Sequence, residues 1–221
     1  MPNPWLSIIT VVKDDASGFA TTLASINAQQ AAGVEFVVID SSTRLTEIPD
    51  LLASTACTYD WVEPAGIYAA MNAGLARATG DYVYFLNAGD TLLAPGSLLG
   101  IQDLIKRDSP EWLFADVQML DDQGQPMTTP PWDYEVEQRA CFARGHFPCH
   151  QGTFVGRDTL LALGGFDTSY RITADYAMFL RLSLRSQPCR VGQVVAAFQP
   201  GGVSSQHWRQ AIDEFHRART E

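Results

Sequence analysis

The sequence predicts one α/β domain over residues 1–221, with a mostly parallel central sheet in the front half, 1–90, and a mixed back half, 91–221. Two observations lead to this fold class. As far as residue 90, short apolar runs alternate with helical patterns. Beyond residue 110 this alternation stops, and the sequence predicts strands joined by a turn, followed by a Pro-rich stretch. With 46% hydrophobic residues, the chain is long enough for one sizeable core.

The start of the front half predicts a strand–helix–strand unit. Residues 5–12 and 34–40 are continuous apolar runs of the kind found inside parallel sheets. Between them, residues 17–30 have the helical period, with Ser17 as the expected N-cap. Its apolar face would consist of Phe19, Leu23 and Ile26. The short connections predict a right-handed parallel crossover.

The same order continues to residue 90. Residues 48–54 predict a short helix, 57–63 a strand, 66–78 a helix that Gly80 ends, and 81–87 another strand. The expected apolar face of the longer helix is Ile67, Met71, Leu75 and Ala78.

The back half is predicted to differ. Residues 95–108 predict a helix, 111–127 two strands across a Gly-containing turn, and 128–150 an irregular segment of a functional kind. The remainder predicts strand, helix, turn, helix and strand over 152–202.

Carboxylates follow the predicted strands of the front half: Asp14 or Asp15, Asp40, and Asp90 in "YVYFLNAGD". Asn, Gly and Asp are ordinary turn residues, but ligands of open α/β sheets bind outside the carboxyl ends of the strands. No Gly-rich phosphate-binding loop is present. A nucleotide in this Rossmann-like half would therefore need a divalent cation on Asp90, and Mg²⁺ or Mn²⁺ favours such oxygen ligands.

A further acid, Asp175, lies near the start of a predicted helix in "YRITADYAMFLRL". An acid at a helix N-terminus is stabilised by the helix dipole alone. Catalysis is the competing interpretation, and spacing does not separate the two.

Composition limits the partners. The net charge of −10 argues against nucleic acid. Residues 1–138 have a net charge of −14 and residues 139–221 one of +4, so the latter could face an anionic substrate, a membrane surface or only solvent. In 207–219, Trp208, Ile212 and Phe215 share one helical face, which would contact a membrane or pack on the domain.

The four cysteines, Cys57, Cys141, Cys149 and Cys189, lack paired spacing and are expected to be free thiols. The offsets in "CFARGHFPCH" do not match usual zinc sites. No apolar run is long enough to span a bilayer, and no signal-peptide pattern is seen. We therefore expect a cytoplasmic protein, which could also make peripheral contact with the inner face of the membrane.

Several stretches, in this order, resemble the family 2 glycosyltransferases of the GT-A fold. They are "SIITVVKDD", "FVVID", "EPAGIYAAMNAGLARATGDYVYFLNAGD", "CHQGTFVGRDTLLALGGFDTSYRITADYAMFLRL" and "FQPGGVSSQ". The last stretch is similar to a subgroup in exopolysaccharide or lipid-linked glycan assembly. The resemblance implies an inverting transfer of a sugar from a nucleoside diphosphate sugar, with uridine as the expected base, to a glycan or lipid-linked acceptor.

The resemblance also implies roles for single residues. Asp90 matches the last acid of the D-x-D-type motif that holds Mg²⁺ or Mn²⁺, although Asn87 and Gly89 depart from the acidic form. Asp175 matches the catalytic base of inverting members. The nucleotide-sugar site would comprise Thr10, Val11, Asp40, Gly66, Asn72 and Asn87, with Asp40 at the base. His150 and Gln151 would lie at the acceptor side, with a structural core histidine as the alternative.

Two other functions stay open from the sequence. A nucleotidyltransferase on a related fold would need a Gly-rich, basic loop after the first strand, which "TVVKDDASG" hardly provides. A non-catalytic module that binds a nucleotide sugar or a glycan would have the same fold.

Overall fold

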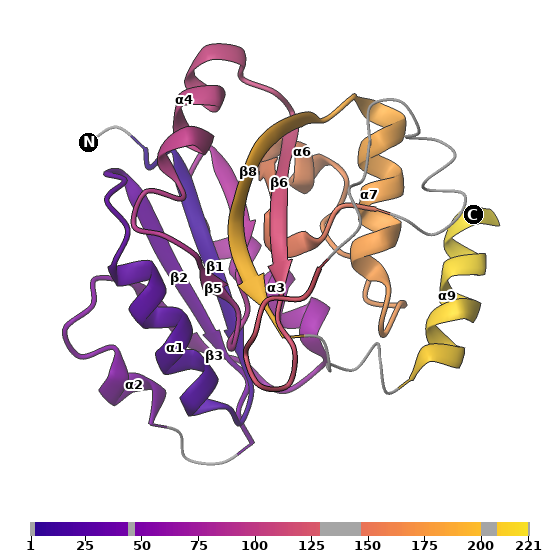
Figure 1. Cartoon of the computed structure of the whole chain (residues 1–221). Coiled ribbons are helices and arrows are strands. Elements are labelled where there is room, and N and C mark those ends of the chain that lie inside the picture. The colour runs from indigo at the N-terminus through magenta and orange to yellow at the C-terminus, as the bar shows by residue number, and fades with distance from the viewer. Residues whose placement is uncertain (1–2, 44–46, 129–146, 200–206, 221) are drawn as a thin grey trace.

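A curled mixed sheet runs through both halves of the chain (Figure 1). In the computed structural model the described residues are 3–43, 47–128, 147–199 and 207–220. Most of the predicted irregular segment lies outside them, as do Cys141 and His146. Within the described ranges the sheet has eight strands in the order β3-β2-β1-β4-β7-β6-β8-β5.

The front part of the sheet is parallel, as predicted. It comprises β1 (Leu6–Val12), β2 (Val34–Asp40), β3 (Thr58–Trp61) and β4 (Tyr82–Phe85). Strand β1 lies between β2 and β4, and its first residue, Leu6, is opposite the first residue of each, Val34 in β2 and Tyr82 in β4. The carboxyl ends of these strands therefore meet at one edge of the sheet.

Helices cover both faces of the sheet. One core cluster packs α1 (Ala16–Asn27), α2 (Ile48–Leu51) and α4 (Leu99–Asp108) against the sheet. The other face is covered by α3 (Ile67–Arg77), α6 (Arg157–Ala162), α7 (Ala174–Arg185) and α9 (Trp208–Thr220). Side chains of β1 alternate between the two clusters, as expected for a strand buried on both sides.

Two details of the predicted helices were wrong. Helix α1 begins at Ala16 and is capped by Asp15, whose carboxylate accepts a hydrogen bond from the Gly18 N–H at 2.9 Å, so Ser17 is not the cap. Ile67 does not share the buried face of α3 but is 42% exposed. It is the first residue of the helix, where the chain still borders an open pocket.

The back half is mixed, as predicted. The 3₁₀ turn η1 (His150–Gly152) leads into β7 (Thr153–Gly156), which is antiparallel to both β4 and β6 (Trp112–Met119). Strand β8 (Cys189–Phe198) is parallel to β6 and antiparallel to the short β5 (Thr91–Leu92). Strand β7 thus joins the two halves into one sheet.

The predicted pair of strands in 111–127 was wrong in its second member. After β6 the chain turns at Gly124, which has φ +75°, and returns through one isolated bridge between Leu120 and Pro126. Pro126 has no N–H to continue a ladder. Strand β6 pairs with β7 and β8 instead.

Candidate active site

The loop after β4 is held by one hydroxyl group from the facing helix α1. The Thr22 hydroxyl accepts from the Gly89 N–H at 3.0 Å and donates to the Asp90 carbonyl at 2.7 Å. Gly89 has φ +94°, a backbone conformation that glycine adopts without strain. The loop therefore keeps a fixed shape that places Asp90 just beyond the sheet.

The Asp90 carboxyl group lies in a buried position, with the residue only 9% exposed. Burial raises its pKa to about 6, against the opposing effects of nearby His150 and of hydrogen bonds from the Gln151 side chain and the Asn87 backbone. A buried carboxylate that is costly to charge is stabilised by a cation beside it.

Asn87 provides a second oxygen at this place. Its Oδ1 atom is buried and has no hydrogen-bond partner among the described residues, and its Nδ2 atom lies 3.1 Å from His150 Nε2. Carboxylate and amide oxygens suit Mg²⁺ or Mn²⁺. Asp90 and Asn87 therefore fit a divalent cation, although within the described ranges no three His, Cys, Asp or Glu side chains gather to form a metal cluster.

Asp175 lies in the first turn of α7 and its side chain is 20% exposed. Its Oδ1 atom accepts from the Tyr176 N–H at 2.9 Å, while its Oδ2 atom is 3.7 Å from His150 Nδ1. His150 thus stands between Asn87 and Asp175. The structure brings together the sequence-predicted residues Asn87, Asp90, His150, Gln151 and Asp175.

Tyr68 belongs to the same cluster and was not singled out from the sequence. Its hydroxyl lies 2.5 Å from the Ile172 carbonyl and 3.2 Å from Asp175 Oδ1. Burial, followed by the charge of Asp175, raises the pKa of Tyr68 far above its usual value, so the phenol stays protonated. In the sequence, Tyr68 differs from its apolar neighbours in the helix predicted over 66–78 only by its hydroxyl group.

Two adjoining pockets open beside this cluster. The first, of about 400 Å³, is lined by the predicted residues Val11, Gly66 and Asn87. The second, of about 450 Å³, lies against the start of α3. Lys13 and Arg171 line both pockets, are exposed, and form no ion pair within the described ranges. Neither cation was selected from the sequence, although the basic character of 139–221 pointed towards the second.

Three other predicted residues have internal partners instead. Thr10 is fully buried and donates its hydroxyl to the Leu86 carbonyl at 2.7 Å. The Asn72 amide donates to the Phe166 carbonyl at 2.8 Å and accepts from the Phe166 N–H at 2.9 Å. A pocket-lining role of Thr10 and Asn72, which the family resemblance implied, stays a prediction, and in this structure the polar atoms of both side chains have partners within the protein.

Asp40 is also fully buried. Its carboxylate accepts from the Ser42 N–H at 2.8 Å and from the Tyr59 hydroxyl at 3.1 Å. Its neighbour Ser41 lines the first pocket. A contact between Asp40 and a nucleotide base stays a prediction.

Cys57 and Cys149 are free thiols, as predicted. Burial raises the pKa of the Cys149 thiol to about 11, which disfavours the thiolate that binds zinc.

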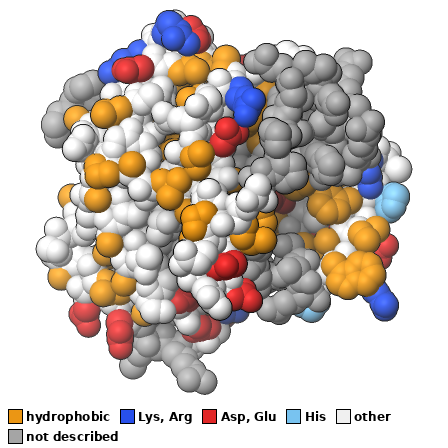
Figure 2. Space-filling model, in the orientation of Figure 1, with side chains coloured by type: hydrophobic (Ala, Val, Ile, Leu, Met, Phe, Trp, Pro, Cys, Tyr) orange, Lys and Arg blue, Asp and Glu red, His pale blue; other side chains and the backbone are white. Residues whose placement is uncertain are grey.

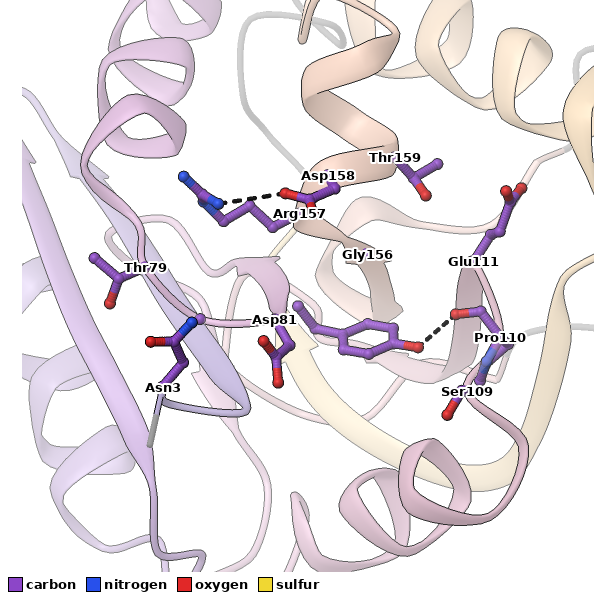
Figure 3. A pocket seen from close by; sticks show the side chains of 12 residues that line it. Asn3, Thr79, Asp81, Ser109, Pro110, Glu111, Gly156, Arg157, Asp158 and Thr159 are labelled. Atoms are coloured by element: carbon purple, nitrogen blue, oxygen red, sulfur yellow. Dashed lines mark hydrogen bonds and ion pairs between the residues drawn. The ribbon is translucent and has the colours of Figure 1, made fainter. Parts of the chain in front are cut away.

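Another pocket, of about 310 Å³, lies at the opposite end of the sheet, where β4 and β6 begin (Figure 3). Two contacts lie within its lining: Arg157 pairs with Asp158 at 3.3 Å, and the Tyr82 hydroxyl donates to the Pro110 carbonyl at 2.5 Å. None of the predicted site residues lines it. The pockets beside Asn87 are therefore the candidate site.

Comparison with solved structures shows which known fold the chain has. S. aureus TarS in complex with UDP superposes with a TM-score of 0.74 at 14% identity, over 93% of this chain and 62% of that chain. The mannosyltransferase PcManGT of Pyrobaculum calidifontis, in complex with GDP-Man and Mn²⁺, superposes with a TM-score of 0.72 at 19% identity. This match covers 100% of this chain and 65% of PcManGT. The chain thus has the GT-A glycosyltransferase fold and spans less than two thirds of these two chains.

Sequence comparison is more specific. The family model described as Glycosyl transferase family 2 matches residues 7–162, and the chain belongs to this family of enzymes. An uncharacterized glycosyltransferase of Mycobacterium tuberculosis is 28% identical over 215 residues, 95% of this chain and 80% of the relative. A PGL/p-HBAD biosynthesis glycosyltransferase of Mycobacterium bovis is 28% identical over 217 residues, which are 93% of this chain and 81% of that relative.

Proposed function

We propose that this protein is an inverting glycosyltransferase that uses a nucleoside diphosphate sugar, with the donor bound mainly by residues 1–90, joined by Arg171, and the acceptor by residues 91–221. The observation that carries the proposal is the pair of acids on either side of His150. Asp90 is buried at the end of β4, and Asp175 is partly exposed on α7. A buried carboxylate suits a cation, while an accessible one can take a proton from a substrate.

The donor site is proposed to be the pocket beside Asn87. A nucleoside diphosphate carries negative charge that must be offset, and Lys13 and Arg171 are the cations that face this space. Bound Mg²⁺ or Mn²⁺, held by Asp90 and Asn87, would stabilise the charge that develops on the leaving diphosphate. Uridine is the proposed base; TarS was solved with UDP, whereas PcManGT was solved with GDP-Man.

In the proposed reaction Asp175 is the general base. The acceptor hydroxyl oxygen forms a bond to the anomeric carbon while its proton passes to Asp175. The bond from that carbon to the diphosphate breaks on the opposite face, which inverts the configuration. The Tyr68 hydroxyl lies 3.2 Å from Asp175 Oδ1 without competing for the acceptor proton, because its raised pKa keeps its own proton in place.

The acceptor is proposed to be a glycan or a lipid-linked glycan. Trp208 and Ile212 on α9 are 56% and 45% exposed, and Figure 2 shows apolar side chains on that side of the molecule next to basic ones. Phe215 does not share this surface; it packs against Phe147 and Tyr176. No helix in the described ranges could span a membrane. Trp208 and Ile212 would support peripheral contact, which flotation with anionic vesicles tests: Trp208→Ala should weaken salt-sensitive binding.

A donor panel tests the proposed function. The protein is incubated with UDP-, GDP- and TDP-sugars, Mn²⁺ and a range of glycan acceptors, and nucleotide diphosphate release is measured. Acceptor-dependent release from one donor supports the proposal. Tight metal-dependent binding without release from any donor would instead favour a non-catalytic nucleotide-sugar module.

A further inference from the structure

Glu214 is a buried carboxylate outside the cluster described above. It stands on α9 and only 8% of the residue is exposed. Its two oxygens accept hydrogen bonds from three successive backbone N–H groups: Arg171 at 3.1 Å, Ile172 at 2.9 Å and Thr173 at 3.0 Å. The Thr173 hydroxyl lies within 3.2 Å of the same carboxylate.

This arrangement stabilises the charged form of Glu214. Burial alone would raise the pKa of a carboxyl group, but the backbone donors at Ile172, Arg171 and Thr173, with the Gln210 side chain, lower the pKa of Glu214. The side chain of the N-cap residue Thr173 makes no capping hydrogen bond to α7, while Glu214 binds the N–H of Thr173 and of the two residues before it. Glu214 therefore holds the backbone that leads into α7 from a different helix.

The segment that Glu214 holds is the one that carries the proposed base. Thr173 is the N-cap of α7 and Asp175 follows two residues later. On the other side of the segment, the Tyr68 hydroxyl lies 2.5 Å from the Ile172 carbonyl. The segment is thus fixed by α9 through its N–H groups and by α3 through a carbonyl.

A second contact from α9 reaches the preceding residues. The Arg217 guanidinium lies 3.7 Å from the centre of the Tyr170 ring, and its NH2 atom is 3.0 Å from the Ser169 hydroxyl. The last described helix therefore contacts the whole stretch from Ser169 to Thr173.

We propose that Glu214 is a positioning residue for the transfer reaction: by holding the backbone of 171–173, it sets the place of Asp175 and of the pocket-lining Arg171. This inference rests on the proposed function of Asp175. It assigns to α9 a part in the active site, although none of the described α9 side chains lines the two pockets beside Asn87.

Glu214→Gln is the variant that tests the inference, with Asp213→Asn, an exposed acid one residue earlier, as the matched control. The amide keeps the shape but removes the charge and one acceptor oxygen. We expect kcat to fall at least tenfold in Glu214→Gln and less than twofold in the control. We also expect the Ile172 and Thr173 amides to exchange hydrogen faster, while amides of β1 and β2 keep their protection. If Glu214→Gln does not fold, as judged by its thermal transition, Glu214→Asp replaces it.

A double-mutant cycle with Asp175→Asn separates positioning from general loss of stability. If Glu214 acts through Asp175, Glu214→Gln lowers the residual kcat of Asp175→Asn by less than twofold. An equal loss of kcat in both backgrounds, or unchanged exchange at Ile172 and Thr173, would overturn the inference. If Asp175→Asn alone kept full kcat, the proposed base would fail, whereas faster exchange in Glu214→Gln would still show that Glu214 holds the segment.

Discussion

The loop 87–90 and the segment 167–175 are held in different ways. The loop follows a strand directly, and its shape comes from its own backbone and the hydroxyl of Thr22. The segment before α7 depends on side chains more than forty positions away in either direction, Tyr68 and Glu214. Both regions therefore depend on side chains remote in sequence, since Thr22 lies 67 positions before Gly89. They differ in that the loop directly follows a strand and is held by one hydroxyl, whereas the segment before α7 is held from two helices, α3 and α9.

The largest expected effect comes from Asp175→Asn. The amide keeps the size of the side chain but cannot take a proton, so kcat should fall by about 10²–10⁴-fold. The dissociation constant of the nucleoside diphosphate, measured by calorimetry with Mn²⁺, should change little, because Asp175 is placed on the acceptor side. Loss of nucleotide affinity in this variant would place Asp175 in the donor site and remove the distinction between the donor and acceptor sides.

Asp90→Asn should raise stability in a pH-dependent way. Burial raises the pKa of Asp90 from 3.8 to about 6, which corresponds to roughly 3 kcal/mol. Below pH 3.8 the group is protonated in both folded and unfolded states, so wild type and variant should be equally stable. As pH rises to about 6 the wild type loses stability relative to the variant, and above that pH the full difference is present.

Thermal unfolding of both proteins between pH 4 and pH 8 measures this difference. Added Mn²⁺ should stabilise the wild type above pH 6, where Asp90 is ionised, and should leave Asp90→Asn unchanged. Equal stabilisation of the two proteins by Mn²⁺ would show that the cation binds elsewhere.

Thr22→Val should destabilise the donor loop without any direct contact to a substrate. Valine has the shape of threonine but leaves the Gly89 N–H and the Asp90 carbonyl without this partner, at a cost of about 1–3 kcal/mol. Thr21→Val is the control, because Thr21 is exposed and, among the residues that the structure describes, its hydroxyl bonds only the Ser17 carbonyl in its own helix. Denaturant unfolding measures both variants, and equal midpoints would contradict the role of Thr22.

The smallest expected effect is that of the pocket cations. Arg171→Ala should weaken nucleoside diphosphate binding by about two- to fivefold, since exposed charge pairs contribute about 1 kcal/mol or less. Lys13→Ala should act similarly. Arg157→Ala, which alters the pocket at the opposite end of the sheet, serves as control and should leave the affinity unchanged.

Apolar patterning was enough to predict the strands β1 to β4 and the helices between them, because burial on one or both faces determines those positions. Asp90 and Asp175 could be selected because each stands at the end of a regular element. Glu214 and Tyr68 could not, since their partners are backbone atoms far away in the sequence. The bond from the Thr10 hydroxyl to the Leu86 carbonyl could not be predicted either, since a hydroxyl that pairs with a neighbouring carbonyl and one that binds a ligand look alike in sequence.

The contact between Asn87 and His150 decides which nitrogen of the imidazole ring carries the hydrogen. An amide nitrogen can only donate, so the Asn87 Nδ2 atom facing His150 Nε2 makes Nε2 the acceptor. In the neutral ring the hydrogen is then on Nδ1, the atom that faces Asp175. An aspartate at position 87 would accept rather than donate and would select the opposite tautomer. An amide rather than a carboxylate at position 87 therefore orients a ring N–H towards Asp175, at the expense of one charged oxygen near Asp90.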